Sequence, residues 1–294
     1  MEQSSHQFIG EFCDYQSAKI VIIPVPLERS TSYLAGTAGG PAAIIEASQN
    51  VELYDIELNS EPFRQGIHTL DPIFFEESDS VTAAFEKIEK CVNQTLKDQK
   101  FPVILGGEHA LSFPSYLAFH NSFTNLSVLH IDAHADLRNE YLGDRYSHAC
   151  VMRRIHEKNQ DIVSIGIRSM CAEEAEFIDT EKPVIYFDHE IYQTGLPVRK
   201  ILSQISQNVY ITFDLDGVNP VELPSVGTPE PGGLGWYQLV SLFEDLFDQK
   251  NVVGLDVVEL KPDNINIHSD FWAAKMIYKI IGLKFKNTVE ADRT

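Results

Sequence analysis

The sequence of 294 residues predicts an α/β fold in which a parallel sheet is covered by helices. Two observations support this fold class. Short apolar runs, several rich in Val and Ile, recur along the chain, and each is too short for the core of a helix. Stretches with helical periodicity lie between them, and alternating strands and helices form parallel sheets. No linker, repeat or low-complexity tract interrupts the alternation, so we expect one domain over residues 1–294.

The apolar runs predict strands that are buried on both faces. In chain order they cover residues 18–26, 101–107, 126–134, 161–169, 183–190, 209–217 and 251–260. Helical periodicity is clearest in residues 80–99 and 239–247, where the apolar side chains fall on one stripe. Pro and Gly are dense in residues 36–43 and 223–236, which predicts loops between elements.

The composition excludes several function classes. With 23 Lys and Arg against 43 Asp and Glu, the formal charge of -20 repels nucleic acid and anionic membranes and attracts small cations. The chain shows neither a secretion signal nor a long apolar segment, so we expect a cytoplasmic protein that does not bind membranes. The four cysteines are scattered without a C-x-x-C pair, which argues against a disulfide framework, a zinc knuckle and a redox motif.

Ionisable residues lie at the end of the run at 126–134 and just beyond it, at the edge where parallel sheets bind ligands. Asp132, His134 and Asp136 occupy every second position and point to one side for as long as the backbone stays extended. Grouped carboxylates repel each other and lose hydration, and a divalent cation compensates both effects. Mixed carboxylate and imidazole donors suit Mn²⁺, Fe²⁺ or Zn²⁺ better than Ca²⁺. The alternative is a solvated strand end with scattered charges.

A second strand end repeats the pattern. Asp214 and Asp216 lie near the end of the run at 209–217. The run at 101–107 ends in two glycines, and His109 lies two residues beyond them. A lone histidine in that position is more often a cap or a core residue. With the first cluster, however, six donors converge where one metal needs three or four, which indicates two metals that share bridging carboxylates.

Three further residues have competing interpretations. Glu259 ends the last apolar run, where a surface or helix-capping acid is the alternative to a functional one. Asp256 is buried by pattern and is a candidate for the layer of side chains around the site. His130 lies one step deeper than Asp132 on the same strand face, which favours packing or support of the site over metal ligation.

Five motifs in order, GGEHALS, HIDAHAD, FDLDGVNP, GTPEPGGL and DVVEL, resemble those of the ureohydrolases. This family of dimanganese enzymes includes arginase, agmatinase, guanidinobutyrase and formiminoglutamase. The resemblance extends over most of the chain, including residues 30–48. It implies a three-layer α/β/α sandwich around a mostly parallel sheet of about eight strands.

The resemblance also implies a ligand set for two Mn²⁺ per subunit. One ion would be bound by His109, Asp132, Asp136 and Asp214, and the other by Asp132, His134, Asp214 and Asp216. Asp132 and Asp214 would then bridge the two ions. A hydroxide held between two Mn²⁺ is a strong nucleophile near neutral pH, and in this family it attacks the guanidinium carbon.

Three catalytic roles follow from the same resemblance. Asp136 would protonate the leaving nitrogen, His148 would carry protons to bulk water, and Glu259 would pair with the guanidinium group and orient it. Family members form trimers or hexamers, so we expect a homo-oligomer whose other partner is a small cationic guanidino substrate.

The segment after the HIDAHAD motif favours agmatine over arginine. Arg138 stands where arginases have an asparagine, and Tyr146 and Ser147 replace an Asn-Leu pair, so arginase is disfavoured. Agmatine is a dication without a carboxylate and suits an acidic protein; its hydrolysis gives urea and putrescine, a step of polyamine biosynthesis. Because a cation near such a substrate is unfavourable, we expect Arg138 to pair with Glu140, Asp144 or another acid.

Other functions remain as alternatives. The substrate could be guanidinobutyrate, arginine or formiminoglutamate. A catalytically inactive metal-binding relative is disfavoured because all six ligand positions, His148 and Glu259 are present.

Overall fold

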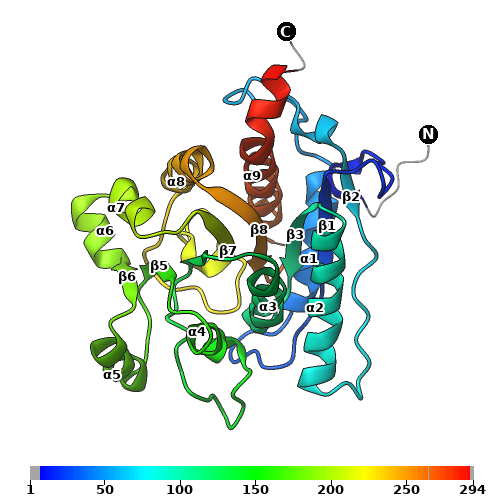
Figure 1. Ribbon diagram of the computed structural model, residues 1–294. Helices are drawn as coiled ribbons and strands as arrows, with labels where there is room; N and C mark the ends of the chain where they lie inside the picture. Colours follow the sequence, from blue (N-terminus) through cyan, green and yellow to red (C-terminus); the bar gives the residue numbers. More distant parts are fainter. Residues whose placement is uncertain (1–6, 264, 292–294) are drawn as a thin grey trace.

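Eight parallel strands form one sheet in the computed structural model, which describes residues 7–263 and 265–291 (Figure 1). The strand order is β2-β1-β3-β8-β7-β4-β5-β6. The strands are β1 Ile20–Val25, β2 Ile67–Thr69, β3 Phe101–Gly106, β4 Leu126–Ile131, β5 Ile162–Ile167, β6 Val184–Phe187, β7 Asn208–Asp214 and β8 Asn251–Val258. Each apolar run contains one strand, as predicted. The eighth strand, β2, is a three-residue edge strand that pairs only with β1 and is too short to form such a run.

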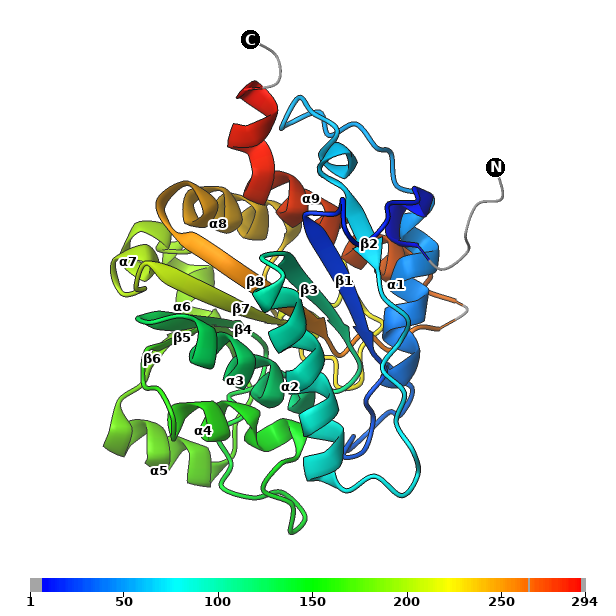
Figure 2. The same ribbon diagram turned by 45° about the vertical axis from the view of Figure 1, so that its right-hand side comes forward.

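Helices cover both faces of the sheet, which confirms the three-layer α/β/α fold (Figure 2). They are α1 Gly40–Ser48, α2 Val81–Lys97, α3 Ser112–Ser122, α4 Val151–His156, α5 Ala172–Glu181, α6 Asp188–Thr194, α7 Val198–Ser203, α8 Trp236–Gln249 and α9 His268–Ala291. One apolar core lies against α1, α8 and α9, and the other against α2, α3 and α4. No helix in the described part of the chain has the length and apolar character needed to cross a lipid bilayer.

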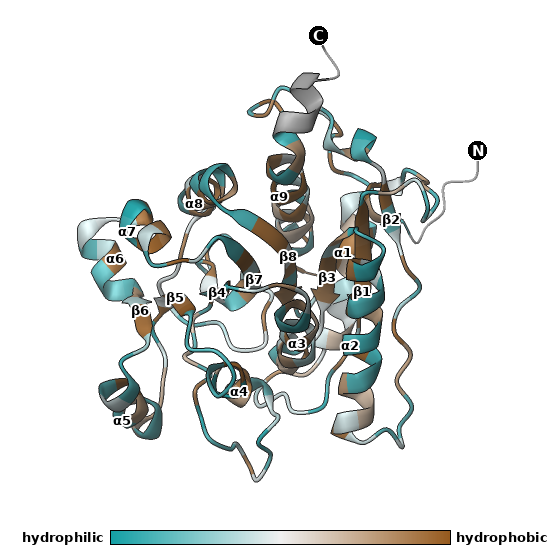
Figure 3. Ribbon diagram, viewed as in Figure 1, coloured by the Kyte–Doolittle hydropathy of each residue, from teal (hydrophilic) through white to brown (hydrophobic). Residues whose placement is uncertain are grey.

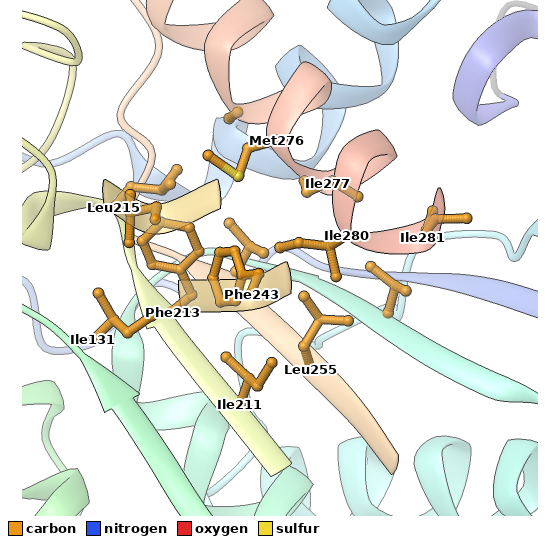
Figure 4. Packing of buried hydrophobic residues seen from close by; sticks show 14 of the residues in the cluster. Ile131, Ile211, Phe213, Leu215, Phe243, Leu255, Met276, Ile277, Ile280 and Ile281 are labelled. Carbon is orange, nitrogen blue, oxygen red and sulfur yellow. The ribbon is translucent and has the colours of Figure 1, made fainter. Parts of the chain in front are cut away.

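The side chains of each strand alternate between the two cores. On β1, Ile20 and Ile22 enter the first core, whereas Val21 and Ile23 enter the second. The strands form the apolar centre, and the outer faces of the helices are hydrophilic (Figure 3). In the first core, the Phe213 and Phe243 rings pack edge to face with centroids 6.0 Å apart, beside side chains from α9 (Figure 4).

The four strands that carry the sequence motifs are neighbours in the sheet. β3, β8, β7 and β4 are adjacent and parallel, so their carboxyl ends meet at one edge. β4 ends at Ile131, and the next residues leave the strand conformation. Asp136 has a left-handed backbone with φ 52°, so an irregular loop rather than extended alternation places the three ionisable residues of this motif.

Candidate metal centre

The loop after β3 delivers His109 to the carboxyl edge of the sheet. It turns at Gly107, where a Cβ atom would lie 2.1 Å from the carbonyl oxygen of Leu27, so only glycine fits. His109 then opens a short 3-10 helix, His109–Leu111, and its backbone N–H donates to Oε1 of Glu259 over 2.6 Å. The end of β3 and the end of β8 are thereby joined at the site.

Three carboxylates surround one ring nitrogen of His109. Nδ1 lies 3.2 Å from Asp132 Oδ2, 3.1 Å from Asp136 Oδ2 and 3.2 Å from Asp214 Oδ2. All four side chains are buried. The structure thus brings together the four residues that the sequence assigns to the first metal.

The arrangement of these four donors fits a cation. Among the described residues, the buried Nδ1 has no hydrogen-bond partner, and the three oxygens lie around it without forming one. The other ring nitrogen, Nε2, lies 2.9 Å from Thr212 Oγ1. One nitrogen and three carboxylate oxygens that converge in the interior are costly to bury unless a positive charge lies between them. Divalent first-row metals such as Mn²⁺ accept this mixture of ligands.

A second group of donors adjoins the first. His134 Nδ1 lies 2.9 Å from Asp216 Oδ2 and 3.6 Å from Asp132 Oδ1. Asp132 therefore turns one oxygen towards His109 and the other towards His134, which is the geometry of a bridging carboxylate. Asp214 Oδ1 accepts the backbone N–H of Asp216 over 2.8 Å, as Asp132 Oδ1 accepts that of His134 over 2.6 Å. A contact between the Asp214 and His134 side chains stays a prediction.

The buried carboxylates and histidines of the cluster shift one another's pKa values. Burial, followed by the charge of Asp132, raises the pKa of the Asp136 carboxyl to about 7. Burial also raises the pKa of Asp214 well above its ordinary value. Burial alone would lower the pKa of His109, but its three carboxylate neighbours raise that pKa well above the ordinary value. Without a cation the cluster therefore retains protons, and a metal ion would displace them.

His130 supports the cluster from beneath. Its Nε2 lies 2.8 Å from Asp132 Oδ2 and its Nδ1 lies 3.0 Å from Ser164 Oγ. His130 is close enough to His109 and Asp132 to form a ligand group with them. However, both of its ring nitrogens already have partners, which favours the supporting role over ligation.

A cavity of about 250 Å³ opens above the donors. Glu259, His148, Arg138, Tyr141 and Glu174 are among the residues that line it. Burial raises the pKa of the Glu259 carboxyl well above its ordinary value. A cation beside this carboxyl would favour its ionised form.

Ser30 holds His148 at the wall of this cavity. The backbone N–H of His148 donates to Ser30 Oγ over 3.0 Å, and His148 Nδ1 lies 3.1 Å from the same hydroxyl. Burial, followed by the charges of His109 and His134, lowers the pKa of His148 to about 4. Ser30 is in turn anchored through its backbone N–H, which donates to the buried Glu108.

Arg138 pairs with Glu174, which is neither of the two acids predicted by name. Its Nε lies 3.9 Å from Oε2 of the buried Glu174, and its guanidinium group lies 5.2 Å from the centre of the Tyr141 ring. Neither Glu140 nor Asp144 is its partner in an ion pair. Glu174 also accepts the backbone N–H groups of Leu137 and Cys171, which fixes it at the cavity wall. Glu174 is the third residue of α5 and accepts the N–H of the preceding cap residue Cys171, so in the sequence it resembles an ordinary helix-capping acid.

A sequence model of the Arginase family matches residues 18–282. The chain belongs to this family. It is 37% identical to an N(1)-aminopropylagmatine ureohydrolase of Thermus thermophilus over 274 residues, which is 92% of each chain. It is 31% identical to an agmatinase of Pyrococcus horikoshii over 274 residues, covering 92% of this chain and 93% of the relative.

The fold agrees with the family. The structure matches the crystal structure of an agmatine ureohydrolase of Thermoplasma volcanium with a TM-score of 0.87 and 32% identity, over 97% of this chain and 96% of that one. The protein is an enzyme of the ureohydrolase class, as the sequence predicts.

Proposed function

We propose that this ureohydrolase is a dimanganese enzyme that cleaves the guanidino group of agmatine to putrescine and urea. The observation that carries the proposal is the double cluster of histidines and carboxylates on the floor of a cavity that also contains Glu259. Asp132, which faces both histidines, would be shared by the two ions, as would Asp214.

Two Mn²⁺ would supply an acidified water as the nucleophile when bound. His109, Asp132, Asp136 and Asp214 would hold one ion. Asp132, His134, Asp214 and Asp216 would hold the other. Of the two ligand histidines, His134 is the more exposed, with 26% of its side chain accessible against 1% for His109.

Glu259 would bind and orient the guanidinium group. Its Oε1 is fixed by the backbone N–H of His109, so the carboxylate plane is set relative to the metal ligands. Its raised pKa favours a neutral acid in the empty cavity, and a bound guanidinium would stabilise the ionised form. Paired charges inside a cavity attract more strongly than in water, which favours a cationic substrate.

His148 and Asp136 would manage protons. Ser30 occupies Nδ1 of His148, which leaves Nε2 as the nitrogen able to exchange a proton within the cavity. The lowered pKa of His148 makes it a neutral proton acceptor at physiological pH. Asp136 Oδ2 faces His109, and Asp136 would protonate the leaving amine.

The cavity wall favours a cationic tail. Glu174 lies at the wall, and Glu230 Oε1 lies 3.7 Å from His134 Nε2. Arg138 is paired with Glu174 and lies against Tyr141, so its charge is compensated. Because Glu174 already compensates Arg138, Glu230 is the acidic group that the amine end of agmatine would meet.

N(1)-aminopropylagmatine is a second candidate substrate. The relative from Thermus thermophilus that bears this name is 37% identical to the chain, compared with 31% for the agmatinase of Pyrococcus horikoshii. The same guanidinium contacts would serve both substrates, and only the length of the amine tail would differ.

Urea release tests the proposal. The full chain is loaded with Mn²⁺ and assayed with agmatine, N(1)-aminopropylagmatine, guanidinobutyrate and arginine, with formamide release from formiminoglutamate as a parallel assay. We expect the highest kcat/KM with agmatine, two Mn²⁺ per chain by metal analysis, and loss of activity in a chelator. Faster turnover of N(1)-aminopropylagmatine would shift the assignment to the second candidate. Turnover of guanidinobutyrate alone would contradict the preference for a cationic tail.

A further inference from the structure

Asp256 is a buried carboxylate in the central strand β8 that the proposed reaction does not use. It is fully buried, and it has no ion-pair partner among the described residues. Instead, two hydroxyl groups from the neighbouring strand β7 donate to it. Tyr210 donates to Oδ2, and Thr212, its register partner across the two strands, donates to Oδ1 over 2.8 Å.

Thr212 connects Asp256 to the metal centre. Thr212 has one hydroxyl proton, and the carboxylate of Asp256 is the stronger acceptor for it. The same Oγ1 lies 2.9 Å from His109 Nε2, so it accepts the N–H of the ring. In the neutral ring this contact selects the Nε2–H tautomer, which leaves Nδ1 as the ligand nitrogen on the side of the three carboxylates.

We propose that Thr212 and Asp256 are positioning residues of the metal centre, which fix the ring orientation and tautomer of His109 through a carboxylate–hydroxyl–imidazole chain. This inference rests on the proposed metal centre. Metal-bound histidines usually donate their second N–H to a carboxylate or carbonyl, which orients the ring and makes it a better ligand. Here a hydroxyl transmits the effect of the carboxylate.

The cost of Asp256 supports a role beyond packing. An ionised carboxylate in a sheet interior loses its hydration, and an apolar side chain of similar size would fill that space at lower cost. The neighbouring positions on β8, Leu255 and Val257, are apolar and belong to the core. Attraction between its charge and a cation held by His109 would offset part of this cost.

The test compares two substitutions of one residue in the full chain. Thr212→Val removes the hydroxyl at nearly constant volume, and Thr212→Ser retains it. The readout is Mn²⁺ affinity, measured by competition with a chelator, so agmatine turnover does not enter the decision. We expect Thr212→Val to weaken one of the two Mn²⁺ sites by about 10- to 100-fold. Thr212→Ser should stay within about threefold of the wild type.

Two more variants separate the chain of hydrogen bonds from the structural role of Asp256. Asp256→Asn should weaken the same Mn²⁺ site in the same direction, because an amide is a weaker acceptor than a carboxylate. Tyr210→Phe removes a hydrogen bond from the same carboxylate without touching Thr212 or His109, and it should leave that affinity nearly unchanged. If Thr212→Val fails to fold, as judged by thermal unfolding of the metal-free protein, the comparison of Asp256→Asn with Tyr210→Phe decides.

Wild-type affinity for both ions in Thr212→Val, or equal losses in Asp256→Asn and Tyr210→Phe, would overturn the inference. A wild-type protein that binds no Mn²⁺ would instead contradict the metal centre itself.

Discussion

Asp136 and Glu259 share a backbone conformation that most side chains avoid. Their φ angles are 52° and 66°, in the left-handed region that favours glycine. Such positions cost about 1–3 kcal/mol each and persist where the surroundings enforce them. The N–H of Glu259 donates to Gly107, and the carbonyl of Asp136 accepts the N–H of Arg153. At both residues the strained backbone aims a carboxylate at the same cavity.

Ser30 gives a prediction at the scale of one residue. Ser30→Ala removes the hydroxyl that contacts both the backbone and Nδ1 of His148, and we expect kcat to fall about three- to tenfold, as for the loss of one hydrogen bond of about 1 kcal/mol. Mn²⁺ content should not change. Ser30→Thr, which retains the hydroxyl, should recover most of the rate. Wild-type kcat in Ser30→Ala, measured by urea release at several pH values, would show that His148 does not depend on this contact.

The elements of the fold were predictable where burial leaves a signal in the sequence. The strands other than β2 were predicted because they are buried enough to be continuously apolar, and the six predicted ligands converge because their strands are neighbours. The partners of these ligands were not predictable. Thr212 and Ser30 lie 103 and 118 residues from His109 and His148, and their contacts depend on strand register and loop path. The spacing of residues along the chain predicts neither strand register nor loop path.

Helix α9 forms a hydrogen bond and ion pairs with the segment between α1 and β2. The hydroxyl of Tyr278 donates to the carbonyl of Leu53 over 2.6 Å. Lys279 Nζ lies 2.5 Å from Asp55 Oδ1 and 2.7 Å from Glu57 Oε2, and both Lys279 and Asp55 are buried. Breaking one partner of such a pair leaves an uncompensated charge inside the protein.

Lys279→Met should therefore destabilise the fold. We expect a loss of about 3–5 kcal/mol, because Asp55 remains buried without its cation. In thermal unfolding this corresponds to a drop in Tm of about 10 °C. Arg64→Gln is the control, because it removes an exposed pair with Glu61 and should leave Tm nearly unchanged. Similar Tm values for the two variants would mean that the buried pair does not hold α9 in place.

At the scale of the whole molecule, the metal site links stability to pH. The chain carries a formal charge of -20, and several of its carboxylates are crowded into one buried cluster. In the metal-free protein the pKa of Asp136 is raised to about 7, and those of Asp214 and His109 are also raised. A group with a raised folded-state pKa stabilises the fold below its unfolded pKa, and this contribution is lost as pH rises through the folded pKa. The lowered pKa of His148 acts in the opposite direction, but only below its ordinary value of 6.5. Between about pH 6.5 and 8 the protein without bound metal should therefore lose stability.

Mn²⁺ reverses this trend because it takes the place of the protons. At higher pH less proton displacement is needed, so binding is tighter and the stabilisation RT ln(1 + [Mn²⁺]/Kd) grows. At a concentration of 100 Kd it reaches about 2.7 kcal/mol, which corresponds to a rise in Tm of about 5–10 °C. We expect this Mn²⁺-induced rise, measured by thermal unfolding, to be small at pH 5.5 and largest near pH 8. It should vanish at both pH values in Asp132→Ala, because that side chain faces both donor groups. A rise that is independent of pH, or one that Asp132→Ala retains, would place the stabilising ion elsewhere on this acidic protein.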